Sequence, residues 1–150
     1  MKQELAHIKG NHVKLLAATL NLRKITCHPA WIDDSYKDSV KYERVRQIVY
    51  EAAKNGQKTI VFSCFTTPFE SSIECLNIMT DLKMYNPAMI IGSTKDRLSQ
   101  VDKFQNDDSC MLIVGSIGAM GTGLTLNRAS NVIFLDEPWT AGVKDQACDR

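Results

Sequence analysis

The sequence has no long hydrophobic run, no Cys-x-x-Cys pair and no excess of either charge. No apolar stretch approaches the roughly 20 residues that span a bilayer, and the first residues lack the apolar core of a signal peptide. We therefore expect no membrane partner and a cytoplasmic location, or a nuclear one in a eukaryote. Lysine and arginine total 18 against 17 aspartate and glutamate, so any contact with nucleic acid depends on local rather than overall charge.

Cysteine and histidine show no pattern of a disulfide framework, a metal site or a nucleophilic site. The five cysteines are an odd number without metal-ligand spacing, which argues against both disulfides and zinc. The three histidines are scattered towards the N-terminal end, and no Ser-His-Asp or Cys-His arrangement stands out. We expect reduced, mostly packed thiols and no metal site in this chain.

A phosphate-binding P-loop is also missing, because neither Gly-Lys-Ser nor Gly-Lys-Thr occurs. The apolar run at 132–135 is followed by Asp136 and Glu137, which resembles the strand that holds Mg²⁺ in P-loop ATPases. That role requires the missing loop, so we interpret Asp136 and Glu137 as a turn or a helix cap. The near match at 56–59 (GQKT) precedes an apolar run, and we interpret it as a turn into a strand.

Helical spacing dominates the first third of the sequence. Apolar residues from Leu15 to Ile25 fall near a helical repeat, which His28-Pro29 ends because the residue before proline avoids the α region. A second helical pattern runs from Ser39 to Asn55, where Asn55-Gly56 supplies a stop. We therefore divide the chain into an N-terminal helical segment, 1–38, and a main domain, 39–150.

Beyond residue 56 the pattern changes to short apolar runs that alternate with helical spacing. The runs are typical of strands buried on both faces of a parallel sheet, and helices are predicted over 68–84 and 94–105. This alternation predicts an α/β fold with a doubly wound, mostly parallel sheet and flanking helices. The four apolar runs lie at 59–62 (TIVF), 88–91 (AMII), 111–114 (MLIV) and 131–135 (NVIFL).

Ligands of open α/β sheets bind at the carboxyl ends of the strands. Three of the four loops that follow the predicted strands are rich in Gly, Ser and Thr, which suits a run of phosphates, although loops often have this composition. Gly121 and Gly123 would let backbone amides approach a phosphate or ribose. Arg97, one turn after the Gly-Ser-Thr loop, is expected to orient or bond to that loop. The four loops are 63–67, 92–95, 115–123 and 136–139.

An ordered set of motifs resembles the second motor lobe of the Swi/Snf-type DNA translocases, a branch of helicase superfamily 2. The resemblance extends from about residue 15 to the last residue. The matching segments are 22–29 (LRKITCHP), 58–65 (KTIVFSCF, motif IV), Gly92-Ser93-Thr94 with Arg97 and Phe104, 116–126 (motif V), 131–139 and 146–150 (QACDR, the first half of motif VI).

The resemblance implies a RecA-like fold in a two-lobed motor, with ATP between the lobes and double-stranded DNA across both. The N-terminal RecA-like lobe of the same parent chain is then a partner that holds most of the ATP and Mg²⁺. We expect the present chain to be truncated inside motif VI and to be inactive alone.

The same resemblance implies roles for individual residues. It assigns nucleotide contacts to Gly121, Thr122 and Gly123. It makes Arg150 an arginine finger, or its neighbour, and Gln146 its companion, and on a helix two residues four apart share one face. It assigns DNA contacts to Ser63, Thr66, Gly92, Ser93, Thr94, Lys95, Arg97, Ser116 and Trp139.

Departures from the family pattern leave two alternatives open. Motif V has Gly118 and Met120-Gly121 where the family often has a basic residue and a Gly-Gly pair. The second lobe of a DEAD-type RNA helicase shares the fold, but its motif VI usually begins His-Arg-Ile-Gly-Arg, unlike residues 146–150. The third reading is a stand-alone α/β binding module without a motor role. A P-loop upstream and a complete motif VI downstream in the parent sequence would favour the motor.

Overall fold

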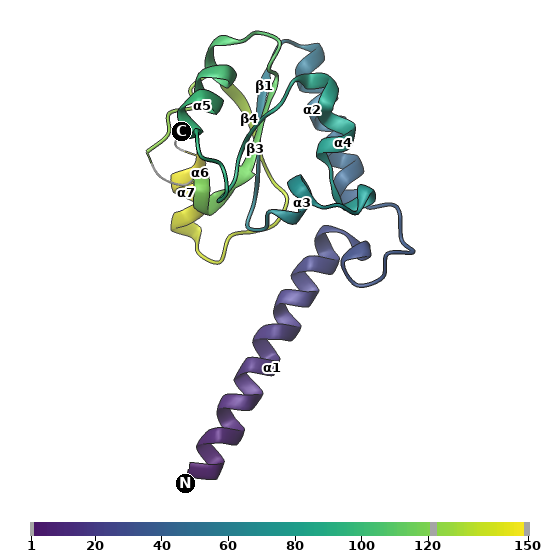
Figure 1. The fold of residues 1–150 in the computed structure, drawn as a ribbon, viewed down its shortest axis with the longest axis vertical. Helices are drawn as coiled ribbons and strands as arrows, with labels where there is room; N and C mark the ends of the chain where they lie inside the picture. Colours follow the sequence, from purple (N-terminus) through teal and green to yellow (C-terminus); the bar gives the residue numbers. More distant parts are fainter. Residues whose placement is uncertain (1, 121–122, 149–150) are drawn as a thin grey trace.

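The computed structural model describes residues 2–120 and 123–148, with side chains described from residue 11 onward. A long helix, α1 (Lys2–Cys27), projects from a rounded α/β domain, and a short 3-10 turn, η1 (Pro29–Trp31), follows it (Figure 1). The helix ends one residue before His28-Pro29, as the sequence predicted.

The domain is built on four parallel strands, in agreement with the predicted sheet. They are β1 (Lys58–Ser63), β2 (Ala88–Ile90), β3 (Leu112–Ser116) and β4 (Ala129–Phe134), in the order β2-β3-β1-β4. In the register of the two central pairings, Ile60 lies opposite Ile113 and Val132. Because every strand runs the same way, all four carboxyl ends meet at one edge of the sheet.

Helices cover both faces of the sheet, so the domain has two apolar layers (Figure 1). Alternate residues of a strand point to opposite faces: Ile60 and Phe62 pack in one layer, and Val61 packs in the other. The first layer contains residues of α5 (Arg97–Asn106), α6 (Ile117–Met120) and α7 (Ala141–Cys148); the second contains residues of α2 (Val40–Lys54), α3 (Thr67–Glu70) and α4 (Met79–Leu82).

Helix α2 begins and ends where the sequence predicted. The Ser39 hydroxyl accepts a hydrogen bond from the Tyr42 amide, which satisfies one of the free donors of the first turn. Asn55 is the C-cap, and Gly56 follows it with φ = +69°, a conformation that glycine adopts without strain. The segment 56–59 is therefore a turn into β1, as expected.

The helix predicted over 68–84 was wrong. The chain there forms α3, two 3-10 turns, η2 (Glu74–Leu76) and η3 (Lys83–Tyr85), and the single turn of α4. Short polar side chains take over backbone partners: Ser71 accepts from the Ile73 amide, and Asn77 donates to the Ser71 carbonyl and accepts from the Met79 amide. Such local bonds compete with the helical ladder and break it.

Helix α5 begins at Arg97, three residues later than predicted. Asp96 caps it by accepting a hydrogen bond from the Ser99 amide at 2.9 Å. At the other end, the buried Lys58 ammonium donates to the carbonyls of Phe104 and Asp107 at 2.6 and 2.8 Å. A cation is favourable beside the C-terminal carbonyls of a helix, so Lys58 joins β1 to α5.

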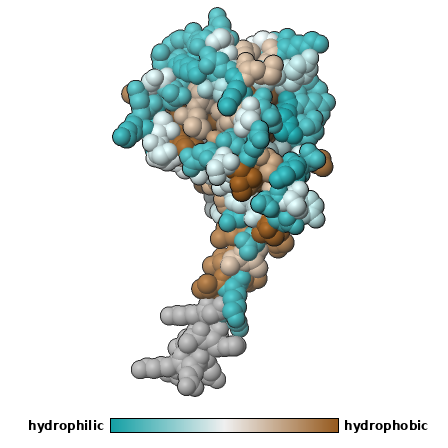
Figure 2. Space-filling model, turned by 45° about the vertical axis from the view of Figure 1, so that its right-hand side comes forward, coloured by the Kyte–Doolittle hydropathy of each residue, from teal (hydrophilic) through white to brown (hydrophobic). Residues whose placement is uncertain are grey.

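Helix α1 carries apolar side chains that the domain does not cover. They include Val13, Leu15, Leu16 and Leu22, each more than half exposed. Figure 2 shows hydrophobic groups, coloured brown, gathered on the part of the helix next to the domain. Within the described residues, no helix combines the length and apolar character that a membrane span requires.

Candidate functional site

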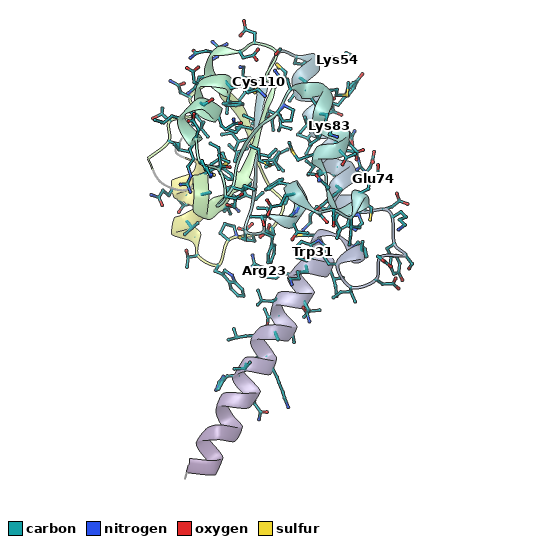
Figure 3. All side chains as sticks on the ribbon, in the orientation of Figure 1. Arg23, Trp31, Lys54, Glu74, Lys83 and Cys110 are labelled. Carbon is teal, nitrogen blue, oxygen red and sulfur yellow. The ribbon has the colours of Figure 1, made fainter. Side chains whose placement is uncertain are left out.

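The candidate site lies on the edge of the sheet where the four strands end. The segments 63–67, 92–95, 116–120 (which includes α6) and 136–139 leave the strands at this edge, and we call their residues the rim. The C-terminal end of α1 joins the domain here. Figure 3 shows Arg23 and Trp31 at this end, with Lys54 and Cys110 towards the opposite end.

The centre of the rim is the carboxylate of Asp136, which is only 5% exposed. Its Oδ1 accepts hydrogen bonds from the Ser63 hydroxyl and from the Cys64 amide, the latter at 3.0 Å. Its Oδ2 lies 3.2 Å from Arg23 Nη2. We call these four residues the clasp, because they connect the ends of β1 and β4 to α1. Burial and the neighbouring Asp136 carboxylate raise the pKa of the Cys64 thiol to about 11.

The guanidinium of Arg23 also lies against aromatic rings. Its Cζ is 4.4 Å from the ring centroid of Trp139 and 5.6 Å from that of Phe65, both within the range of a cation-π contact. Phe65 packs edge-on against Trp31 at 5.2 Å, and the Lys24 ammonium lies 5.2 Å from the Trp31 ring. A continuous series of ring and cation contacts therefore connects Trp139 and Phe65 of the rim to the end of α1.

The end of α1 is held in the domain by residues next to the clasp. Cys27 is fully buried, and its thiol lies 3.6 Å from the Leu135 carbonyl oxygen; burial raises its pKa to about 11. The Ser39 hydroxyl donates to the Cys27 carbonyl at 2.8 Å. His28 is buried against Tyr42, and its Nδ1 accepts a hydrogen bond from the Ala30 amide. Burial, followed by the charge of Arg46, lowers the pKa of His28.

The clasp corrects one interpretation of the sequence. Asp136 was expected to be a turn or helix-capping residue, whereas its carboxylate bonds to α1 and to the end of β1. Sequence reasoning also gave Arg23 no role in the site. The sequence did contain a signal for such a role: Arg23 shares a helical face with Leu16, Leu20 and Cys27. A charge within an apolar stripe needs a buried partner.

Some of the predicted DNA-contacting residues are exposed, and others are already hydrogen-bonded within the protein. Gly92, Ser93 and Lys95 are exposed after β2, Trp139 is 61% exposed after β4, and Thr66 and Ser116 are half-buried. Two hydroxyls already have partners in the protein. Ser63 is fully buried and donates to Asp136, while Thr94 accepts from the Ile91 amide at 3.0 Å and shapes its own loop.

Arg97 does not bond to the Gly-Ser-Thr loop as expected. Its Nη1 donates to the Ala119 carbonyl at 3.3 Å, which connects the start of α5 to α6. Ala119 belongs to the rim and Arg97 lies two residues past the segment 92–95, so Arg97 holds the segment after β3 against the segment after β2.

The predicted nucleotide-binding residues are only partly described. Gly121, Thr122 and Arg150 lie outside the described residues. Gly123 is exposed and has φ = +73°, a conformation that a residue with a Cβ rarely adopts. Gln146 is exposed on α7, and Lys144 of the same helix pairs with Glu137 of the rim at 2.7 Å.

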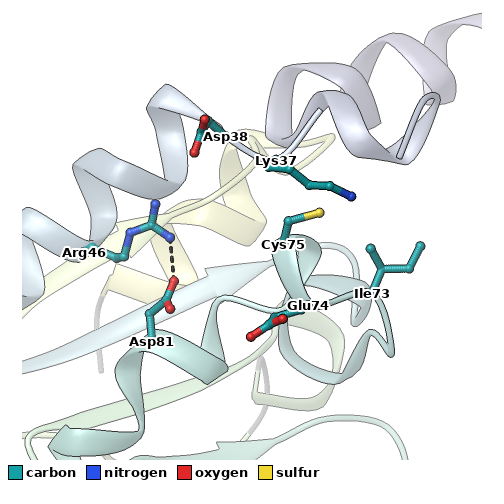
Figure 4. Close-up of a pocket in the computed structure, with 7 residues that line it drawn as sticks. All are labelled: Lys37, Asp38, Arg46, Ile73, Glu74, Cys75 and Asp81. Carbon is teal, nitrogen blue, oxygen red and sulfur yellow. Dashed lines mark hydrogen bonds and ion pairs between the residues drawn. The ribbon is translucent and has the colours of Figure 1, made fainter. Parts of the chain in front are cut away.

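A cavity of about 720 Å³ lies away from the clasp, between α2 and the η2 and α4 segments (Figure 4). Its charges are mixed, and Arg46 is already paired with Asp81 at 2.6 Å and with Glu43 at 3.1 Å. We assign no ligand to it. The residues that line this cavity are Lys37, Asp38, Arg46, Ile73, Glu74, Cys75 and Asp81.

Across residues 2–120 and 123–148, no three His, Cys, Asp or Glu side chains are grouped as metal ligands.

Comparison with known proteins relates the chain to helicases. The family described as the helicase conserved C-terminal domain matches residues 40–150. An uncharacterized ATP-dependent helicase of Mycoplasma genitalium is 29% identical over 144 residues, which are 93% of this chain and 14% of that protein. The chain thus spans about one seventh of this curated relative.

Two solved structures from Sulfolobus solfataricus resemble the fold. The SWI2/SNF2 ATPase core in complex with double-stranded DNA is 31% identical with a TM-score of 0.70, over 91% of this chain and 29% of that one. The SWI2/SNF2 ATPase C-terminal domain is 28% identical with a TM-score of 0.66, over 86% of this chain and 59% of that one.

Proposed function

Because this chain belongs to the helicase conserved C-terminal domain family, in its Swi2/Snf2 branch, we propose that it is the second motor lobe of an ATP-dependent double-stranded DNA translocase. One observation carries the proposal. The solved core with a TM-score of 0.70 is bound to double-stranded DNA, and the present chain gathers the loops that follow all four strands at one edge.

On the DNA side, the rim offers backbone amides, short hydroxyls and one lysine to a phosphate backbone. Gly92, Ser93 and Lys95 form an exposed group after the edge strand β2. Ser116 ends the adjacent strand β3, and Thr66 follows β1, the next strand along the sheet. Contacts of this kind position a protein on DNA without reading its sequence. Trp139 adds an aromatic surface, while Ser63, Thr94 and Arg97 act by supporting the loops.

On the nucleotide side, we assign contacts to Gly121, Thr122 and Gly123, and the arginine finger to Arg150 with Gln146 beside it. A guanidinium suits this role because its planar fork binds phosphate oxygens in pairs and stays charged. The sequence has no P-loop, so we assign most contacts to ATP and Mg²⁺ to an N-terminal lobe of the parent chain. We therefore expect no ATP hydrolysis by this chain alone.

Binding of fluorescent duplexes to this chain tests the DNA side. We expect weak binding, equal for two unrelated sequences, with a log-log salt slope of about −1 to −3 because few cations face the rim. Lys95→Ala should weaken binding. Lys83→Ala is the matched control, since Lys83 is also exposed but lies well away from Arg23 (Figure 3). Equal effects of the two variants, or a strong preference for one sequence, would contradict the proposal.

A further inference from the structure

We infer that Arg23 is a positioning residue, which fixes the loop from Asp136 to Trp139 and thereby the ring that Trp139 presents to DNA. The inference rests on the proposed function in one respect, because the contact between Trp139 and DNA belongs to that proposal. The positioning itself depends only on contacts within the chain.

Arg23 contacts this loop at its start, its middle and its end. Nη2 lies 3.2 Å from the Asp136 carboxylate and also donates to the Glu137 carbonyl. The guanidinium carbon Cζ lies over the Trp139 ring, 4.4 Å from the ring centroid. Nη1 is buried without a hydrogen-bond partner among the described residues, so the rings of Trp139 and Phe65 take the place of a second oxygen partner.

The other described ion pair of this loop restrains it much less. Lys144 and Glu137 form a pair whose side chains are 41% and 69% exposed, and exposed pairs contribute little. The side chains of Arg23 and Asp136 are 17% and 3% exposed, and Asp136 also receives the Ser63 hydroxyl and the Cys64 amide. Of these side chains, Arg23 contacts three residues of the loop, Asp136, Glu137 and Trp139, whereas the Ser63 hydroxyl and Lys144 are each bonded to one.

Arginine is suited to this position and lysine is not. The planar guanidinium can bond to oxygens at its edge while it stacks on a ring with its face. An ammonium can pair with Asp136, but it has no flat face to place on Trp139. The structure thus predicts that lysine preserves the charge pair and loses the orientation of the ring.

The clasp also couples the loop to α1. Arg23 lies one turn before Cys27, where α1 enters the domain. The part of α1 that precedes Arg23 exposes Leu15, Leu16 and Leu22. A displacement of α1 would carry the guanidinium away from Asp136 and Trp139. The presentation of Trp139 therefore depends on the placement of α1.

A single-tryptophan reporter tests the inference without DNA. The sequence has two tryptophans, and Trp31→Phe leaves Trp139 as the only one. This change keeps a ring against Phe65 and removes an Nε1 that makes no hydrogen bond in the described part of the chain. In this background, acrylamide quenching of fluorescence is compared for Arg23→Ala, Arg23→Lys and Arg128→Ala.

The control removes a pair of the same type from the opposite edge. Arg128 pairs with Asp108 at 3.1 Å and precedes β4 rather than following it. We expect Arg23→Ala to raise the quenching constant, by at most about 1.6-fold since Trp139 is already 61% exposed, because the ring face under the guanidinium becomes accessible. Arg23→Lys should raise it nearly as much. Arg128→Ala should leave it unchanged. Circular dichroism checks that each variant is folded; if Arg23→Ala is not, Arg23→Lys decides.

Quenching constants of folded Arg23 variants equal to that of Arg128→Ala would overturn the inference, whatever their DNA affinity. A structural role in stability alone would lower the melting temperature without exposing Trp139 in the folded state. The DNA arm is separate: because Trp139 would no longer be held in place, we expect Arg23→Lys to weaken duplex binding about fivefold. Raised quenching with unchanged DNA affinity would confirm the positioning and reject Trp139 as a DNA contact.

Discussion

Replacing Asp136 with asparagine should destabilise the chain strongly, because the carboxylate is buried and is bonded to three partners of the clasp. The new amide keeps nearly the same shape but loses the charge, and its NH₂ group would face either Arg23 or the donors on Ser63 and Cys64. Removing one partner of a fully buried ion pair costs about 3–5 kcal/mol. Because the Arg23 side chain is 17% exposed, we expect a smaller loss of about 2–3 kcal/mol.

Urea denaturation followed by circular dichroism measures this change, and the melting temperature should fall by about 5–10 °C for a chain of this size. Asp108→Asn is the matched control, since Asp108 also pairs with an arginine but is 91% exposed, and its effect should remain within about 0.5 kcal/mol. Asp136→Asn and Asp108→Asn with equal unfolding free energies would refute the argument that the clasp holds the rim together.

Two further predictions concern packing and pH. Gly115→Ala should lower the free energy of unfolding by about 3 kcal/mol, because a Cβ there would lie 2.1 Å from the Ile90 carbonyl oxygen. Gly118 has open space around it, so Gly118→Ala should be neutral or slightly stabilising in the same urea titration. Equal urea midpoints for the two variants would contradict this packing. The pKa of His28 lies below its ordinary value of 6.5, so near pH 6 the unfolded chain binds more protons than the folded chain. The free energy of unfolding should therefore have its full value above about pH 6.5. Below that pH it should decrease by at most about 1.4 kcal/mol per pH unit. His28→Gln should flatten the pH profile of the melting temperature, whereas His12→Gln, at an exposed position, should not; the opposite pattern would exclude His28 as the titrating group.

The sequence predicted the sheet because its strands are short apolar runs, and this signal is local. Residues 59–62 and 111–114 are almost entirely buried in adjacent parallel strands. The parallel order then implied that the Gly- and Ser-rich loops share one edge. The start of α2 was equally readable, since Ser39 is a capping residue directly before an apolar helical pattern.

The parts that the sequence did not predict depend on partners distant in the chain or on competition within it. Arg23 and Asp136 are 113 residues apart, and no local pattern connects them. The helix expected over 68–84 failed because Ser71 and Asn77 bond to nearby backbone groups, which spacing of apolar residues does not reveal. Arg97 lies next to the Gly-Ser-Thr loop as predicted, but the carbonyl that it bonds to, that of Ala119, belongs to α6.

DNA-stimulated ATP turnover of a longer protein that carries this chain tests the second-lobe assignment most directly, with Arg150→Lys compared against Arg128→Lys. Arginine fingers contribute roughly 10³ to 10⁵ in turnover, and lysine does not reproduce the paired phosphate contacts. We predict that Arg150→Lys loses most of the rate while ATP affinity changes little, and that Arg128→Lys behaves as the unmodified protein. Near-normal turnover of Arg150→Lys would contradict the assignment of this chain to the arginine side of an ATP site.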